Sequence, residues 1–407
     1  MLVCAGPLNG QLLVPMDAGQ ENHLKAYGLA YWTLAQGGKA EWLLNYRSGS
    51  FLVRDTEAER RKAALMGVTV ESMSAASVAE MRRTIETSNM ESVPLERAPR
   101  VAVYTPPNSS PWDDAVTLAL QYAGIPYEKI WDGEVLNGDL ARYDWLHLHH
   151  EDFTGQYSKF YLTYTGSPWL QEEVARNEAM AAEWGYPNVP ELKKAVAQAL
   201  RSYVNDGGFL FAMCTATETL DLALAAGNTD IAAWFADGSP PDPTADGKLQ
   251  WAESLAFTGA ELITDPKLSA FSDIDGHQVN TPWRRPLATF SLFDFSAKFD
   301  PVPAMLTQSH ERVVDDFYGL TTTFRRERLK PGVTVLAEEA GTGLVKYVHG
   351  ELGKGTFTFL GGHDPEDPRH LIGDPPTDLD LHRHSPGYRL ILNNVLFPAA
   401  KKKKLKT

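Results

Sequence analysis

Cysteine is scarce in this chain, and long hydrophobic runs are missing. The 407 residues include two cysteines, Cys4 and Cys214, which supply neither a disulfide framework nor a C-x-x-C metal site. No apolar run approaches the roughly 18 residues that a transmembrane helix needs. The opening stretch, residues 1–11, is too short for a secretory signal. We therefore expect a soluble cytoplasmic protein, or an exported one if a signal was removed upstream.

Basic residues are fewer than acidic residues. Lys and Arg number 38 against 52 Asp and Glu, which gives a formal net charge of -14. No basic stripe offsets this charge, so nucleic acid is disfavoured as a partner. The one basic run, Lys401–Lys404, lies in a C-terminal stretch, 398–407, that we interpret as a solvated tail. Nothing in the residues indicates an oligomeric state.

Nucleotide-binding motifs are absent. The segment "GELGKG" lacks the pattern G-x-x-x-x-G-K-[ST] and precedes a strand rather than a helix, and no G-x-G-x-x-G fingerprint occurs. We therefore expect a small-molecule substrate and no cofactor.

Strands and helices alternate along the chain in two regions. In region 1–92, residues 12–16 and 40–44 predict strands around a helix within 22–38, a β-α-β unit. Because the strands here are short and few, we expect this region to pack on the main sheet or extend it. Helices 56–66 and 75–87 and strand 68–73 follow. The polar, proline-bearing stretch 88–100 predicts a linker, and residues 93–100 are taken as the linker between the two regions.

The pattern restarts at residue 101 and continues to 397. Strands are predicted at 127–131, 143–148 and 207–211, and helices at 113–123 and 190–205. Residues 228–329 show no clear period and predict an insertion. Residues 343–362 predict a hairpin, and Ser385 followed by Pro386 predicts the start of a last helix. This alternation predicts an α/β fold, a parallel sheet with helices on both faces.

Cys214 stands at an abrupt junction between a strand and a helix, in "GGFLFAMCTATETLDLALAAG". A nucleophile on such a turn lies at the carboxyl edge of a sheet, with small neighbours such as Ala212 and Ala216. The helix N-terminus lowers a thiol pKa, and the N–H of Thr215 would point at an oxyanion. Thr215 and Glu218 also fit a capping box. The alternative is a buried core cysteine.

A candidate base follows a later strand. The stretch "FLGGHDPEDPRH" places His363 directly after an apolar run, at the same predicted edge of the sheet. Asp364, Glu366 and Asp367 are available to orient its imidazole. The alternative is a solvated acidic turn with a capping histidine.

A second polar cluster, "HLHHEDFTGQ", ends another predicted strand. Its members are His147, His149, His150, Glu151 and Asp152. Three interpretations remain open: donors and substrate contacts near the nucleophile, a metal site with His363, or loop residues with satisfied hydrogen bonds. The spacing matches no specific metal motif, so we expect no bound metal.

These motifs resemble a known superfamily. The stretches "FLFAMCTATE" and "FLGGHDPED" and the last helix "YRLILNNVLF" resemble class I glutamine amidotransferase-like proteins, which implies a flavodoxin-like fold. The ending "GKGTFTFLGGHD" is similar to trehalose-utilisation-type members. Stretches such as "NHLKAYGLAYW" and "DPPTDLDLHRHSPGYRLILNN" resemble bacterial proteins often labelled asparagine synthetase B. The resemblance implies that Cys214 is the nucleophile and His363 the base.

The chain departs from the superfamily pattern at several positions. The usual G-x-C-x-G is A-M-C-T-A here, and Glu218 stands where members often have glutamine. The superfamily order H-P-E is H-D-P-E here, so Glu366 is one residue further from the histidine than the usual acid. Asp364 is therefore a second candidate for the acid that orients His363. Synthetase chemistry is not indicated, because Cys4 is not at the mature terminus and no loop resembling S-G-G-x-D-S occurs.

Two hypotheses about function follow. In the first, the protein is a cysteine-dependent hydrolase or amidase of a small C–N bond. Cys214 attacks, His363 relays the proton, Glu366 or Asp364 orients His363, and the Thr215 N–H holds the oxyanion. In the second, the fold is a non-catalytic binding protein for a sugar or peptide. That protein would use aromatic side chains of the insertion: Trp234, Trp251, Trp283, Phe290 and Phe293.

Overall fold

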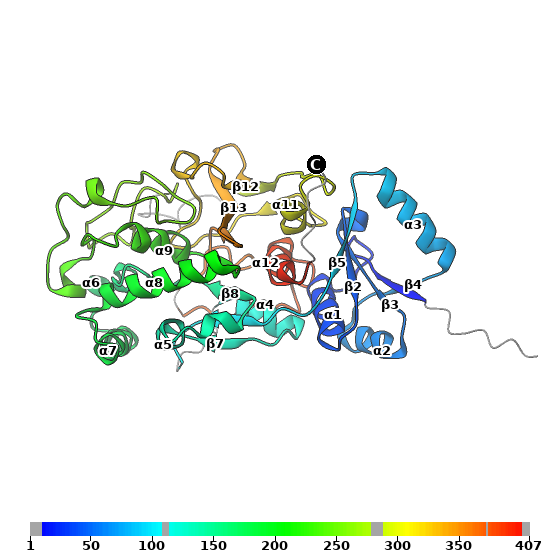
Figure 1. The fold of residues 1–407 in the computed structure, drawn as a ribbon, viewed down its shortest axis with the longest axis horizontal. Helices are drawn as coiled ribbons and strands as arrows, with labels where there is room; N and C mark the ends of the chain where they lie inside the picture. Colours follow the sequence, from blue (N-terminus) through cyan, green and yellow to red (C-terminus); the bar gives the residue numbers. More distant parts are fainter. Residues whose placement is uncertain (1–9, 108–113, 278–287, 372, 401–407) are drawn as a thin grey trace, which may run out of the picture.

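A computed structural model describes residues 10–107, 114–277, 288–371 and 373–400. The described chain forms two sheets, one of five strands and one of nine (Figure 1). Cys4, Trp283 and the run Lys401–Lys404 lie outside the described residues. No helix among the residues described is long and apolar enough to cross a membrane.

The N-terminal sheet is antiparallel. Its order is β4 (Glu71–Met73), β1 (Gln11–Val14), β3 (Ser50–Arg54), β2 (Ala40–Leu44) and β5 (Glu91–Leu95), and each neighbouring pair is antiparallel. The predicted β-α-β unit is therefore split, because β3 lies between β1 and β2. The sequence pattern missed β3, and β5 occupies part of the stretch predicted as a linker. Helices α1 (His23–Ala35), α2 (Glu57–Met66) and α3 (Ala75–Thr87) complete this part.

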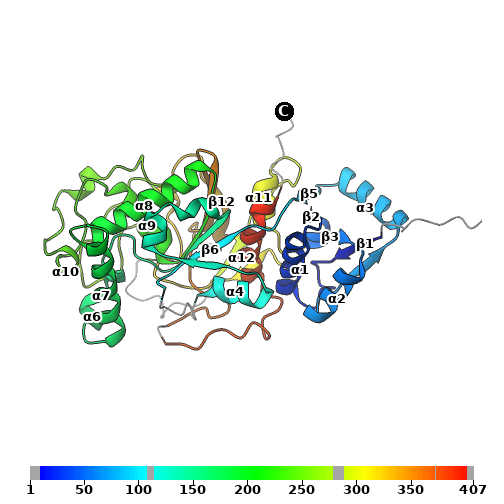
Figure 2. The ribbon, with the colours of Figure 1, turned by 60° about the horizontal axis from the view of Figure 1, so that its bottom comes forward.

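Helix α1 joins the two parts of the molecule. It packs on its own sheet and also on α4 (Ala115–Ala123) and α12 (Pro386–Leu396), as Figure 2 shows. The approach to α4 is so close that a Cβ added at Gly28 would lie 1.8 Å from the Ala123 carbonyl oxygen. The fully buried Arg389 of α12 donates to the carbonyl oxygens of Met16 and Ser48. The N-terminal region thus packs on the main part through a helix and forms its own sheet.

The large sheet is mixed, so the fold is α/β but not all parallel. Five strands are parallel, in the order β7 (Glu128–Ile130), β6 (Val101–Tyr104), β8 (Trp145–Leu148), β9 (Phe209–Met213) and β14 (Gly355–Leu360). Four antiparallel strands extend it beyond β14: β13 (Val345–Leu352), β12 (Thr334–Glu339), β10 (Thr289–Leu292) and β11 (Val313–Asp315). The β13–β14 pair is the predicted hairpin.

Helices cover both faces of the parallel strands. Along β9, Phe209, Phe211 and Met213 belong to the core shared with α1, α4 and α12, whereas Leu210 and Ala212 belong to the opposite core. The opposite core is covered by α5 (Asp132–Leu136), α7 (Pro168–Glu183), α8 (Val189–Asp206) and α9 (Thr215–Ala225). Burial on both faces explains why these strands read as continuous apolar runs.

The described part of the stretch predicted as an irregular insertion contains two short α-helices and two strands at one end of the large sheet. The helices are α10 (Trp234–Asp237) and α11 (Pro301–Leu306), and the strands are β10 and β11. A further short helix, α6 (Tyr161–Tyr164), and α7 precede α8 and were missed by the sequence pattern. Of the aromatic residues proposed for ligand binding, Phe290 is buried in the core, whereas Trp234 is 54% exposed.

Candidate functional site

The parallel strands bring polar side chains together at their carboxyl ends. Asp114 follows β6, His149 and His150 follow β8, Cys214 follows β9, and His363 follows β14. Two backbone hydrogen bonds join these loops: Cys214 N–H donates to Gly362 O at 3.2 Å, and Ala216 N–H donates to His149 O at 3.0 Å. The loops of Cys214, His149 and His363 are therefore adjacent.

Cys214 occupies the junction that the sequence predicts, in a strained conformation. Its φ of 50° and ψ of -137° are unusual for a residue with a side chain, and α9 begins at the next residue. The predicted capping box is wrong, because Thr215 is the first helical residue and Cys214 takes the N-cap position. The Glu218 carboxylate instead accepts hydrogen bonds from Ser272 Oγ at 2.6 Å and Thr321 Oγ1 at 3.0 Å.

The sulfur of Cys214 is enclosed. The residue is 1% exposed, and a Cβ added at Gly319 would lie 3.0 Å from the sulfur. Burial raises the pKa of the Cys214 thiol, and hydrogen bonds from the backbone of Leu320, Thr215 and Thr321 oppose only part of that effect. The expected lowering of this pKa is therefore wrong, since desolvation outweighs the helix N-terminus.

Cys214 and His363 do not form a hydrogen-bonded pair. Within the described parts of the chain, the side-chain partner of the sulfur is Thr215 Oγ1, at 3.7 Å, and no hydrogen bond joins Cys214 to His363. Burial lowers the pKa of His363 well below its usual range, and the charges of His149, His150 and His370 act in the same direction. His363 is therefore neutral at neutral pH.

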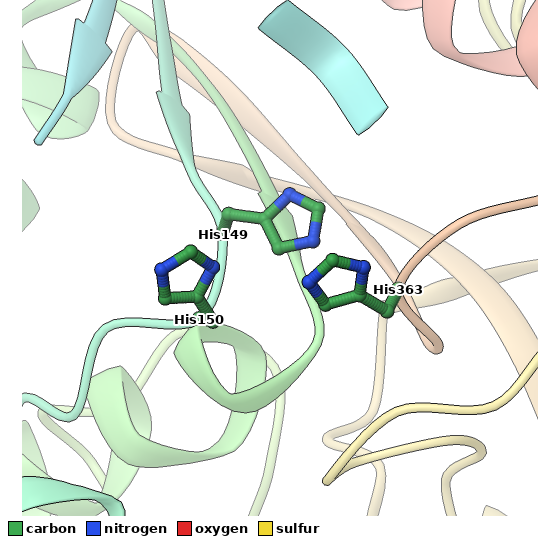
Figure 3. A group of neighbouring side chains, drawn as sticks. All are labelled: His149, His150 and His363. Carbon is green, nitrogen blue, oxygen red and sulfur yellow. The ribbon is translucent and has the colours of Figure 1, made fainter. Parts of the chain in front are cut away.

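Three histidines form a cluster beside the cysteine. His149, His150 and His363 each offer a ring nitrogen, and these nitrogens lie within 4.8 Å of one another. The ring centroids of His149 and His363 are 4.3 Å apart, and the His150 and His363 rings stack at 5.9 Å. Figure 3 shows His149 and His150 arriving from one segment and His363 from another, with the three rings gathered together.

Asp114 orients the buried histidines. Its Oδ1 lies 3.3 Å from His149 Nδ1, and its Oδ2 lies 3.4 Å from His147 Nε2. The other ring nitrogen of His147 lies 3.1 Å from the carbonyl oxygen of Phe211. The Asp114 carboxylate also caps α4 by accepting from the N–H groups of Val116 and Thr117. The contact with Asp114 leaves His149 Nε2 directed elsewhere.

Two ring nitrogens of the cluster have no hydrogen-bond partner among the residues that the structure describes. His149 Nε2 and His363 Nδ1 are buried, and neither makes a hydrogen bond with any described residue. His149 is 1% exposed and His363 is 8% exposed. Burial lowers the pKa of His149, although Asp114 opposes the shift. A buried polar atom without a partner costs about 1–3 kcal/mol, which points to a role for these nitrogens beyond folding.

The acids predicted to orient His363 have other partners. Asp364 accepts from the N–H groups of Glu366 and Asp367, from Thr377 Oγ1 and from the Tyr388 hydroxyl. Glu366 lies 2.8 Å from His382 Nδ1. Neither carboxylate hydrogen-bonds His363 in the described residues, so both stabilise the loop around it.

The acids after β8 also shape their own loop. Glu151 accepts from the His149 N–H at 3.0 Å. Asp152 accepts from the N–H groups of Thr154, Gln156 and Ser158. The next part of the loop contains three consecutive residues with positive φ: Tyr157, Ser158 and Lys159. These carboxylates hold the backbone that carries the histidines.

Sequence reasoning missed two residues of the site. Asp114 is the N-cap residue of α4. Its place before a helix was the only signal in the sequence, and that signal indicates a helix cap rather than a partner of histidine. His370 stacks on His363 with centroids 4.3 Å apart and rings 4° from parallel. Its Nδ1 lies 2.9 Å from Asp367 Oδ2.

Comparison with known proteins gives distant similarity alone. No family model matches the chain, and no curated protein matches it. A cytoplasmic protein of Salmonella typhimurium LT2 is 11% identical, with 74% of this chain and 100% of that one covered and a TM-score of 0.35. A ThuA-like protein of Bacteroides uniformis is 11% identical, with 72% and 92% covered and a TM-score of 0.29.

A third solved structure is a glycosidase. The GH42 beta-galactosidase Gan42B of G. stearothermophilus is 12% identical, with 66% of this chain and 28% of that one covered and a TM-score of 0.30. These values assign no activity to the chain.

Proposed function

We propose that the protein hydrolyses a small molecule at a C–N bond, with the cluster of His149, His150 and His363 as its catalytic centre. The parallel strands follow the order second, first, third, fourth, fifth along the chain, which is the flavodoxin-like order. In open sheets of this kind, ligands bind outside the carboxyl ends of the strands. The cluster lies at those ends.

One observation carries the proposal. The buried nitrogens His149 Nε2 and His363 Nδ1 have no hydrogen-bond partner among the described residues. A neutral imidazole with a free nitrogen can accept a proton from water, and Asp114 stabilises the charge that then forms on His149. Activated water attacks the carbon of the C–N bond, and the proton passes to the departing amine.

Cys214 provides a second candidate for the nucleophile. Its positive φ and the backbone groups of Thr215, Leu320 and Thr321 around the sulfur favour it. The covering segment at Gly319 would have to move before the sulfur meets a substrate.

Turnover of small amides, ureas and lactams by purified variants tests the proposal. His149→Asn and His363→Asn should each lower kcat/KM at least about 100-fold, because general acid–base catalysis contributes about 10²–10⁴-fold. Cys214→Ser should retain activity. His382→Asn is the matched control, because His382 pairs with Glu366 and lies outside the cluster.

Two results would contradict this assignment. If Cys214→Ser abolishes turnover while the histidine variants retain it, the cysteine mechanism is correct instead. If no compound of the panel is hydrolysed and oligosaccharides bind through Trp234, the alternative of a sugar-binding protein is correct.

A further inference from the structure

We infer that His149, His150 and His363 bind one divalent transition-metal ion, with Zn²⁺ as the best match. This inference deepens the proposed function, and its catalytic meaning rests on that function. Binding of the ion itself can be measured without turnover.

The donor atoms suit zinc. Imidazole nitrogens are preferred ligands of Zn²⁺, and three histidines with one open position are typical of catalytic zinc sites. Histidine binds a metal through a ring nitrogen that carries no proton. The metal would satisfy the buried nitrogens that have no partner, His149 Nε2 and His363 Nδ1.

The spacing of the three rings is close to that of a bound site. Nitrogens around a tetrahedral Zn²⁺ at about 2.0–2.1 Å lie roughly 3.4 Å apart. The three nitrogens here lie within 4.8 Å of one another. Closing the difference would require rotation of the exposed His150 side chain and small shifts of the two buried rings.

Asp114 contacts the second ring nitrogen of His149. Metal-binding histidines usually donate their second N–H to a carboxylate, which fixes the ring and strengthens the ligand. The contact of 3.3 Å between Asp114 Oδ1 and His149 Nδ1 has this form. Asp114 is buried, so its negative charge also favours a cation nearby.

Other clusters of potential ligands fit less well. In the group of His277, Asp316 and Glu339, Asp316 already pairs with Lys346 Nζ at 2.6 Å. In the group of Asp367, His370 and Asp374, the His370 Nδ1 already contacts Asp367 Oδ2 at 2.9 Å. The cluster at the strand ends combines converging histidines with buried nitrogens that lack partners.

A bound zinc ion would replace the imidazole nitrogens as the group that activates water, because those nitrogens would then be its ligands. Zinc lowers the pKa of its water to about 7, so that hydroxide is available at neutral pH. The hydroxide oxygen bonds to the carbon of the substrate as the C–N bond breaks. The proton that the water lost would go to solvent, and the departing nitrogen would take up a proton from solvent.

The test is a titration of the full chain with Zn²⁺ alone. Protein is stripped with dipicolinate, and binding is followed by competition with a fluorescent zinc chelator. Co²⁺ provides a second readout, because tetrahedral Co²⁺ absorbs strongly in visible light. We expect one ion per chain with a Kd below about 1 µM, since structural and catalytic zinc sites bind tightly.

Variants locate the ion. His363→Asn and His150→Asn should each weaken Zn²⁺ binding at least about 100-fold, and His382→Asn should leave the Kd unchanged. His150 is exposed, so its variant keeps the test valid if the variants of the buried histidines do not fold. A Kd weaker than about 100 µM for the folded parent chain, or tight binding that His150→Asn and His363→Asn leave unaltered, overturns the inference.

The outcomes for metal and for activity are separable. Tight binding by the three histidines without hydrolysis of any compound upholds the metal site and removes the proposed function. Hydrolysis that persists in folded protein with no zinc affinity upholds the function and removes the metal site.

Discussion

The Oδ1 atom of Asp114 lies 3.3 Å from the Nδ1 atom of His149, and the same carboxylate caps helix α4. One buried side chain therefore performs two separable tasks. Its first task is to orient a histidine of the cluster, and its second is to start a helix of the core.

Replacing Asp114 separates these two tasks. Asp114→Asn keeps a good N-cap but loses the negative charge, so we expect nearly unchanged folding and Zn²⁺ binding weakened about 10–100-fold. Asp114→Ala should lose about 1 kcal/mol more of the free energy of unfolding, because the cap is also lost. Urea denaturation and zinc competition provide the two readouts. Equal zinc affinity for the parent chain and Asp114→Asn would contradict the orienting role.

Cys214 should be protected from alkylation in the native protein. Burial raises the pKa of its thiol, and the segment at Gly319 covers the sulfur. We expect iodoacetamide to modify Cys214 at pH 7 at least about 100-fold more slowly than in urea-unfolded chains, because the thiolate is rare and access is blocked. Peptide mass spectrometry measures the rate at this site. Equal rates in native and unfolded protein would show that the covering segment opens freely.

Lys346 should hold that covering segment in place. Its Nζ pairs with Asp316 and donates to the carbonyl oxygens of Phe317 and Thr322, which flank the segment. Lys346 and Asp316 are both fully buried, so Lys346→Met leaves an uncompensated charge and should cost about 3–5 kcal/mol. Urea denaturation measures this loss. Alkylation of the remaining folded protein should become faster at Cys214.

The exposed Lys267→Met is the control for Lys346→Met and should change stability by less than about 0.5 kcal/mol. A stable Lys346→Met protein with a protected cysteine would show that the ion pair does not hold the segment.

Glu218 should make stability depend on pH. Burial raises the pKa of its carboxyl from 4.5 to about 7, despite hydrogen bonds from Ser272 and Thr321. Between these two values the folded protein keeps a proton that the unfolded chain releases. The free energy of unfolding should therefore fall by about 3 kcal/mol as pH rises from about 4.5 to 7.

The variant Glu218→Gln isolates this effect. From pH 4.5 to 7 the free energy of unfolding of this variant should fall by about 3 kcal/mol less than that of the parent chain. The exposed Glu311→Gln should follow the parent. Urea denaturation at several pH values measures the difference. Parallel curves for the parent chain and Glu218→Gln would refute the shifted pKa.

Gly28 should tolerate no side chain. A Cβ at this position would lie 1.8 Å from the Ala123 carbonyl oxygen, so helices α1 and α4 must separate. We expect Gly28→Ala to lower the free energy of unfolding by about 3 kcal/mol. It should also speed proteolysis after Arg97 and Arg100. Gly166→Ala, which meets nothing within 4 Å, is the control.

The sequence was sufficient for most elements of the core and for the neighbourhood of the site. Continuous apolar runs with clear breakers indicated β9 and the β13–β14 hairpin, and Ser385 indicated the start of α12. The strands β10 and β11, which end one side of the large sheet, lie in a polar, aromatic stretch that showed no clear period. Their pairing depends on partners distant in the chain, which local pattern does not report.

The contacts within the site were harder to predict. Strand ends indicated that His149, Cys214 and His363 share an edge, but not which side chains meet there. Burial of Cys214 comes from Gly319, about a hundred residues away, and the orientation of His149 comes from Asp114. Both partners act through tertiary packing, so neither spacing nor motif revealed them.

The contact of Arg389 with the carbonyl oxygen of Met16 spans 373 residues of sequence. The first sheet therefore completes its burial with a helix near the end of the described chain. During synthesis, the N-terminal segment can make this contact only after residue 389 has been added. Such long-range contacts predict slow folding.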